Sequence, residues 1–124
     1  MRLADLDVLI VDDHDAMRAM LARALDAAGV RRVRTAANAA SALAQLTQRA
    51  ADLVLADRNM PGTDGLSFVA AVRANPALRT ARIIMISGHA GAEHAEAARA
   101  AGADAVLTKP VSPRALIAAI AALP

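Results

Sequence analysis

Four short apolar runs of this sequence each lead directly into polar residues that could do chemistry. The polar residues are Asp12 and Asp13, Asp57, Ser87, and Thr108 with Lys109. Carboxylate oxygens are the ligands that a hard divalent cation such as Mg²⁺ takes in proteins. A hydroxyl and an ammonium group are donors that bind phosphate oxygens. Taken singly, each of these residues reads as an ordinary residue at the end of a strand. Only the set together, with each member at the end of a predicted strand, indicates a functional site.

The apolar runs predict the strands that must position these residues. The three strong runs are 8–11, 53–56 and 83–86, and weaker candidates are 32–36 and 105–107. None of the strong runs alternates in polarity, which is typical of strands buried on both faces of a parallel sheet.

Helical patterns lie between the runs and have recognisable start and stop signals. The first covers 15–28 and is stopped by Gly29, and the fourth covers 90–101. Asn38, Asp64 and Ser112 are predicted N-caps of the second, third and fifth helices. This repeated strand–helix order predicts an α/β fold with helices on both faces of a parallel sheet. In such sheets, ligands bind at the carboxyl ends of the strands.

Length and composition bound the function. A chain of 124 residues fits one domain, and the absence of cysteine excludes disulfides and thiolate metal sites. We expect no signal peptide, no membrane span and a cytoplasmic protein. The pI of about 10.4 reflects a net charge of only +2 in a chain with one lysine. The basic cluster of Arg31, Arg32 and Arg34 is interpreted as a solvated strand edge, because no aromatic residues accompany it to bind nucleic acid.

Taken in order, Asp12-Asp13, Asp57, Ser87 and Lys109-Pro110 resemble the motif set of response-regulator receiver domains of bacterial two-component systems, of the chemotaxis-regulator type. The segment 57–65 is similar to the family's loop after its phosphorylation site, and the resemblance covers essentially the whole chain. It implies a flavodoxin-like (βα)5 three-layer sandwich, with a five-stranded parallel sheet in the order 2-1-3-4-5. Residues 1–124 would form a single receiver domain with no output domain.

The resemblance also implies a role for each site residue. Asp57 would be phosphorylated, and Ser87 and Lys109 would bind the phosphoryl group. Mg²⁺ would be held by Asp12, Asp13, Asp57 and the backbone carbonyl of Asn59. The Lys109–Pro110 peptide bond would be cis. The loop from Met60 to Thr63 is predicted to be a type II turn, with Pro61 and Gly62 at its centre.

Three further residues are candidate modulators: Arg58, His89 and Val106. Arg58 is expected over the mouth of the cleft, and His89 beside it. His14 and His94 are interpreted as solvated helix residues. Val106 stands where the family usually has a tyrosine or phenylalanine that swings inward on phosphorylation. Our hypothesis is that output uses the loop after Ser87, or that the protein mainly passes phosphoryl groups on.

The resemblance implies a signalling switch and not an enzyme, beyond self-catalysed phosphotransfer and dephosphorylation. The donor would be a histidine kinase or a histidine phosphotransfer protein. A downstream protein would bind the face made by the fourth helix, the fifth strand and the fifth helix, without nucleic acid or membrane. One alternative is a phosphate sink or phosphorelay intermediate, and another is a degenerate receiver that only binds. A haloacid-dehalogenase-like phosphatase is a third alternative, but Asn59 stands where that family needs an aspartate.

Overall fold

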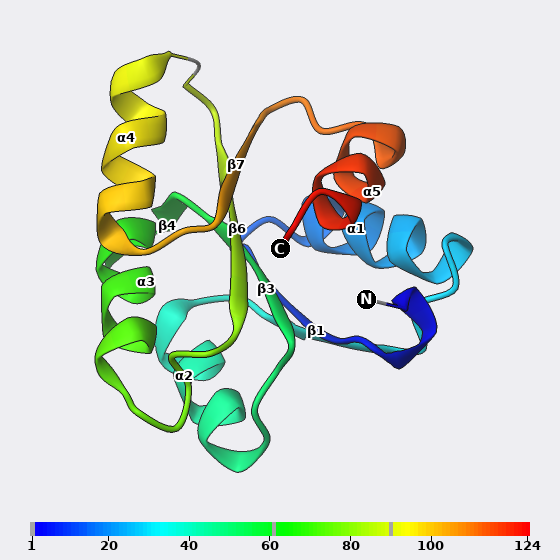
Figure 1. Cartoon of the computed structure of the whole chain (residues 1–124), viewed down its shortest axis with the longest axis horizontal. Helices are drawn as coiled ribbons and strands as arrows, with labels where there is room; N and C mark the ends of the chain where they lie inside the picture. The colour runs from blue at the N-terminus through cyan, green and yellow to red at the C-terminus, as the bar shows by residue number, and fades with distance from the viewer. Residues whose placement is uncertain (1, 61, 90) are drawn as a thin grey trace.

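A parallel sheet of five strands forms the centre of the molecule, seen nearly edge-on in Figure 1. The structure is a computed structural model, and it describes residues 2–60, 62–89 and 91–124. The strand order is β2-β1-β3-β6-β7, which confirms the predicted 2-1-3-4-5 order, since the fourth and fifth strands of this sheet are β6 and β7. The strands are β1 (Asp7–Val11), β2 (Arg32–Ala36), β3 (Leu53–Asp57), β6 (Arg82–Ser87) and β7 (Ala105–Thr108).

Helices cover both faces of the sheet, as the alternating pattern predicted. A short 3-10 turn, η1 (Leu3–Asp5), precedes β1. The first and last helices, α1 and α5, pack on one face, and α2, α3 and α4 pack on the other (Figure 1). The helices are α1 (Asp15–Ala27), α2 (Ala39–Gln48), α3 (Gly65–Ala74), α4 (Ala92–Ala101) and α5 (Pro113–Ala121).

The central strands are buried on both faces because alternate side chains enter two separate cores. In β1, Leu9 and Val11 pack in the core under α2, α3 and α4, whereas Val8 and Ile10 pack in the core under α1 and α5. All five residues of β1 and of β3 are buried. This explains why the strong apolar runs do not alternate in polarity.

The predicted N-caps are confirmed, so the helices that carry them begin where the sequence indicated. Asn38 accepts a hydrogen bond from the Ser41 backbone N–H, Asp64 from that of Leu66, and Ser112 from that of Ala115. The fourth helix, predicted over 90–101, begins at Ala92, and Ala90 lies outside the described residues.

A small hairpin that the sequence did not predict lies between β3 and α3. Its strands, β4 (Asn59–Met60) and β5 (Thr63–Asp64), are antiparallel. Gly62 has a φ of 79°, the positive value expected at the third position of a type II turn. The half of the turn prediction that rests on Pro61 lies outside the described residues. No helix in the described part of the chain is both long and apolar enough to cross a membrane.

Candidate functional site

The register of the sheet brings the predicted site residues together at one edge. Val11 of β1 pairs with Ala56 of β3, so the residues that follow them, Asp12 and Asp57, are neighbours. Asp57 in turn pairs with Ile86 of β6, which places Ser87 one residue further along the next strand. Ser87 pairs with Thr108 of β7, and Lys109 follows. The Lys109 backbone N–H donates to the Ser87 carbonyl over 2.8 Å, which ties the last two strand ends together.

Three aspartates form a compact acidic cluster at this edge. Asp12 and Asp57 are each only 1% exposed, and Asp13 is half-buried. One oxygen from each aspartate and one ring nitrogen of His14 all lie within 4.8 Å of one another. Three buried or half-buried carboxylates at this separation repel one another unless a cation or protons neutralise them.

Hydrogen bonds satisfy only part of the cluster. Asp12 Oδ1 accepts from the His14 backbone N–H over 2.8 Å. Asp57 Oδ1 accepts from the Asn59 backbone N–H over 3.3 Å and lies 3.2 Å from Lys109 Nζ. Among the described residues, three buried oxygens have no hydrogen-bond partner, namely Asp12 Oδ2, Asp13 Oδ1 and Asp57 Oδ2. His14 Nδ1 is 3.2 Å from Asp13 Oδ1, but not in hydrogen-bonding geometry.

The electrostatic surroundings of Asp57 show the same lack of compensation. Burial raises the pKa of the Asp57 carboxyl above its ordinary value, and the negative charge of Asp12 raises it further. The Asn59 backbone N–H and the Lys109 ammonium lower this pKa, but they do not cancel the increase. A single ammonium group is therefore insufficient to balance the cluster.

A hard divalent cation fits this donor set. Buried carboxylate oxygens without partners are costly, and coordination to a cation would satisfy all three at once. Mg²⁺ takes oxygen ligands and keeps part of its water shell, so a cluster that is partly open at Asp13 suits it. The acidic group found in the structure is thus compatible with magnesium binding at the predicted residues Asp12, Asp13 and Asp57.

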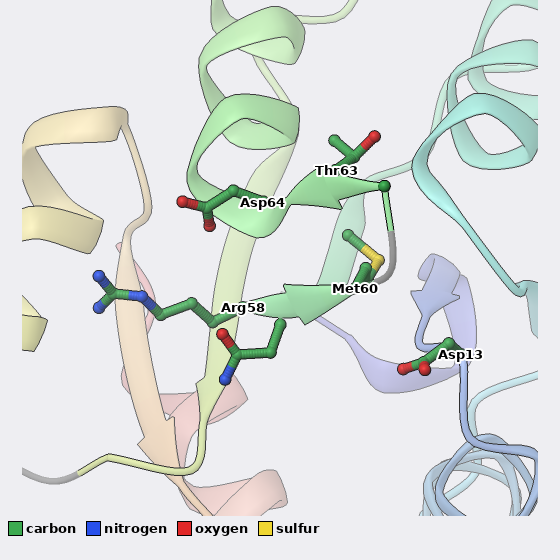
Figure 2. A pocket seen from close by; sticks show the side chains of 7 residues that line it. Asp13, Arg58, Met60, Thr63 and Asp64 are labelled. Atoms are coloured by element: carbon green, nitrogen blue, oxygen red, sulfur yellow. The ribbon is translucent and has the colours of Figure 1, made fainter.

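An open hollow of about 490 Å³ adjoins the acidic cluster. It is lined by Asp13, Arg58, Asn59, Met60, Gly62, Thr63 and Asp64. Figure 2 shows Asp13 on one side of it and the β4–β5 hairpin across from it. The hollow leaves solvent and small ligands a route to the partly exposed side of the cluster.

Ser87 is buried beside the cluster and is bonded to the backbone that follows it. Its Oγ accepts from the His89 N–H over 3.1 Å and donates to the His89 carbonyl over 3.3 Å. The side chain is only 1% exposed. The hydroxyl is therefore already positioned at the strand end, with its one proton committed to the loop after β6.

The three candidate modulators lie around this group of residues, but not all as expected. Arg58 lines the hollow beside Asp13, in keeping with its expected place near the cleft mouth. Its guanidinium extends toward α4 and away from Asp13 (Figure 2). Its Nη1 lies 3.1 Å from His94 Nδ1. His89 is exposed, and its ring stacks on the ring of His94. His94, interpreted as a solvated helix residue, is in fact half-buried in these contacts.

Val106 occupies the predicted position in β7, paired with Met85 of β6. It is half-buried and packs against the core under α2, α3 and α4. A valine side chain has one χ angle and no ring to rotate over several ångströms. The inward swing of an aromatic side chain at this place is thus not open to this chain.

Gly65 is a site residue whose importance the sequence reasoning missed. A Cβ at this position would lie 2.4 Å from the Asp57 carbonyl oxygen and 2.6 Å from the Arg58 Cα. The Gly65 backbone N–H donates to the Arg58 carbonyl over 2.7 Å. The first turn of α3 therefore packs directly on the backbone that carries Asp57. The signal available in the sequence was a glycine directly after a predicted N-cap.

The Lys109–Pro110 peptide bond is cis, as the resemblance implied. Lys109 is itself half-buried, with its ammonium group toward Asp57. The lysine of the predicted site therefore contacts the predicted phosphate acceptor, and it lies at the same strand ends as Asp12, Asp13 and Ser87.

Comparisons with known proteins agree with this geometry. The family model described as "Response regulator receiver domain" matches residues 8–121. A probable chemotaxis protein CheY of Rhizobium etli is 34% identical over 118 residues, which cover 95% of this chain and 92% of that protein. The phosphate regulon transcriptional regulatory protein PhoB of Pseudomonas aeruginosa is 34% identical over 116 residues, and the chain spans about half of its length.

Solved structures give the same result. The chemotaxis response regulator CheY4 of Vibrio cholerae superposes with a TM-score of 0.88 at 34% identity, covering 94% of this chain and 96% of that one. A putative response regulator from Chloroflexus aurantiacus superposes with a TM-score of 0.87, also at 34% identity, covering 93% of each chain.

Proposed function

The chain belongs to the response regulator receiver domain family, and from that membership we propose that Asp57 is the residue on which it accepts a phosphoryl group. The family match over residues 8–121 favours this reading over a haloacid-dehalogenase-like phosphatase. One observation carries the proposal. Asp57 is a buried carboxylate with one oxygen beside the Lys109 ammonium and the other without a partner among the described residues.

The chemistry is a transfer between two nucleophiles. An Asp57 oxygen attacks the phosphorus of a phosphohistidine, a new O–P bond forms, and the N–P bond of the donor breaks. The electron pair of that bond returns to the donor's imidazole, which takes up a proton. Such a transfer depends on positioning and on charge neutralisation more than on covalent assistance from the protein.

The chain's own residues would do that positioning. Lys109 Nζ, 3.2 Å from Asp57 Oδ1, would pair with an oxygen of the transferred group. The Ser87 hydroxyl would donate to a second oxygen. Mg²⁺, held by Asp12, Asp13, Asp57 and the backbone carbonyl of Asn59, would supply positive charge that the cluster lacks.

The same proposal covers regulation and partners. The phosphoryl donor is a histidine kinase or a histidine phosphotransfer protein, in keeping with the chemotaxis relatives. Transfer and hydrolysis are self-catalysed at Asp57, and the protein acts in the cytoplasm without binding nucleic acid. The described chain acts as a single receiver domain, whose phosphorylated form binds a downstream protein through the face made by α4, β7 and α5. Val106 favours one alternative, a phosphorelay intermediate without its own output, because the usual aromatic reporter is missing.

Intact-mass measurement after incubation with acetyl phosphate and Mg²⁺ tests the proposal. We expect the wild type to gain the mass of one phosphoryl group, and Asp57→Asn to gain nothing. Asp64→Asn is a matched control, because Asp64 is an exposed carboxylate of the same segment and asparagine caps a helix equally well. An adduct on Asp57→Asn, or none on the wild type, overturns the proposed function.

A further inference from the structure

Two histidines connect the loop after β6 to the first turn of α4. The rings of His89 and His94 are stacked, with centroids 5.1 Å apart and planes inclined by 19°. His89 is two residues beyond Ser87, and His94 is the third residue of α4. This pair is therefore a direct contact between the loop after the strand end that carries Ser87 and the helix on the proposed output face.

The backbone of His89 is bonded to the Ser87 hydroxyl in a way that phosphorylation must change. In the structure Ser87 Oγ donates to the His89 carbonyl over 3.3 Å and accepts from the His89 N–H over 3.1 Å. A serine hydroxyl has one proton to donate. If that proton is given to a phosphoryl oxygen on Asp57, the His89 carbonyl loses its donor, and the loop is free to move with Ser87.

The other residue of the pair, His94, contacts Arg58, which directly follows Asp57. Arg58 Nη1 donates to the His94 carbonyl over 3.3 Å and lies 3.1 Å from His94 Nδ1. The Arg58 backbone is itself held, because its N–H donates to Ile86 and its carbonyl accepts from Gly65. His94 is thus tied to the residue directly after Asp57, whereas His89 is tied to Ser87.

The helix that receives these contacts is otherwise held toward its far end, where Ala98 is buried and Arg73 Nε donates to the Gly102 carbonyl over 2.9 Å. Its N-cap is Gly91, which has no side chain to bond the first turn. Within Ala92–Ala101, Ala98 is the one buried residue. An element with so little buried surface can shift at a small cost in free energy. The contacts of His94 are therefore a substantial part of what positions the start of α4.

We propose that the His89–His94 stack carries the phosphorylation signal from Ser87 to α4, in place of the aromatic ring that position 106 lacks. When the Ser87 hydroxyl turns to the phosphoryl group, the His89 backbone loses its hydrogen bond and His89 can move. Arg58 holds His94 in place, so this movement either separates the two rings or shifts the start of α4. The inference rests on the proposed function, because it needs a phosphoryl group on Asp57.

Nuclear magnetic resonance tests the relay with few competing signals. The chain has three histidines and one phenylalanine, with no tyrosine or tryptophan, so each ring can be assigned by substitution. The full chain is compared with and without beryllofluoride and Mg²⁺, a stable mimic of the phosphoryl group. We expect the ring protons of His89 and His94 to shift as their mutual ring current changes, together with the backbone amides of the first turn of α4.

Two variants separate the relay from a merely structural role. His89→Ala keeps the backbone bonds to Ser87 but removes one ring, and His94→Ala removes the other. In both, we expect loading of Asp57 to continue while most of the amide shift in α4 is lost. Glu96→Ala, an exposed residue of the same helix, is the control and should keep the full shift.

The outcomes distinguish this inference from the proposed function. If acetyl phosphate gives no adduct on Asp57 by intact mass, the proposed function fails and the relay fails with it. If the adduct forms while the two histidine rings and α4 stay unshifted, the relay alone is wrong. Full α4 shifts in both histidine variants would also overturn it, by showing that the signal takes another route.

Discussion

The two ends of strand β1 each hold a buried aspartate, but the surroundings of the two carboxylates differ. At the start of the strand, Asp7 lies 3.0 Å from Arg34 Nη2 and 2.8 Å from Arg49 Nε. Beyond its end, Asp12 keeps one oxygen without a partner among the described residues, and Asp57 beside it does the same. The negative charge is thus balanced by arginines at the amino-terminal end of β1, but it is not balanced in the cluster at the carboxyl ends of the strands.

This difference separates a structural carboxylate from one kept for a ligand. Burying a charge without a partner is costly in free energy. An unpaired buried carboxylate is therefore expected where a ligand from outside the chain neutralises it. The Asp7 carboxylate already has its positive partners within the chain. The cluster at Asp57 leaves ligand positions open, and it lies at the strand ends where α/β sheets bind ligands. Substitutions that change the charge balance at either end of β1 test this distinction.

The largest change in folding stability is expected when the carboxylate at the compensated end, Asp7, is removed. Asp7→Ala leaves the Arg34 guanidinium, whose side chain is only 16% exposed, without its carboxylate. Removing one partner of a buried pair costs about 3 kcal/mol or more. Urea denaturation followed by circular dichroism should show this loss, and phosphorylation of the folded fraction should be unchanged. A stability close to wild type would show that the Asp7 pairs are not what holds this edge.

Magnesium binding at the uncompensated end should raise the free energy of unfolding by nearly as much as Asp7→Ala lowers it. A ligand that binds only the folded state at one hundred times its dissociation constant adds about 2.7 kcal/mol. We expect that gain for the wild type in denaturation with and without Mg²⁺, and most of it to be lost in Asp13→Asn. The control Asp64→Asn should keep it, because Asp64 already caps α3. An equal gain in Asp13→Asn would place the ion elsewhere.

Removing one negative charge from the cluster should stabilise the fold when Mg²⁺ is absent, by less than the two changes above. Because burial and Asp12 raise the pKa of Asp57, the folded state favours its neutral form. Asp57→Asn should therefore be more stable than the wild type in the absence of Mg²⁺ near neutral pH, as urea denaturation of the two proteins would show.

The same pKa shift gives the pH dependence its direction. Folded protein binds the Asp57 proton more tightly than the unfolded chain, whose ordinary pKa is 3.8. The contribution of Asp57 to wild-type stability is therefore greatest below that value, and it falls as pH rises through the raised folded pKa. The advantage of Asp57→Asn should grow across this window and then stay constant. An advantage that shrank with rising pH would contradict the assigned direction.

What the sequence predicted and what it missed follow the same division between local and distant contacts. The strand ends, the N-caps Asn38, Asp64 and Ser112, and the grouping of the site residues were predicted, since each depends on neighbouring residues or on a family motif. The pairing of Asp7 with Arg34 and Arg49 was not predicted. It depends on side chains from β2 and the end of α2, and Arg34 was interpreted as part of a solvated edge.

The contacts around α4 were missed for the same reason. Arg58 and His94 are 36 residues apart, and no periodicity or spacing relates them. The β4–β5 hairpin is formed by strands of two residues each, too short to produce an alternating pattern. Gly65 could have been noticed, but its close approach to the Asp57 backbone depends on how α3 packs, which no local signal reports.

The smallest loss of folding stability should come from breaking the exposed Arg49–Asp7 ion pair. Arg49 pairs with Asp7 Oδ2, but its side chain is 58% exposed, and exposed ion pairs contribute about 0.5 kcal/mol. In Arg49→Ala, Asp7 keeps Arg34, so we expect a loss of about that size in urea denaturation. Arg34→Ala should cost more, because Arg34 also donates to the carbonyls of Gln45 and Ala50. Equal losses for the two arginines would mean that burial does not set the strength of these pairs. A loss for Arg49→Ala as large as that for Asp7→Ala would mean that Arg34 alone does not balance the charge of Asp7.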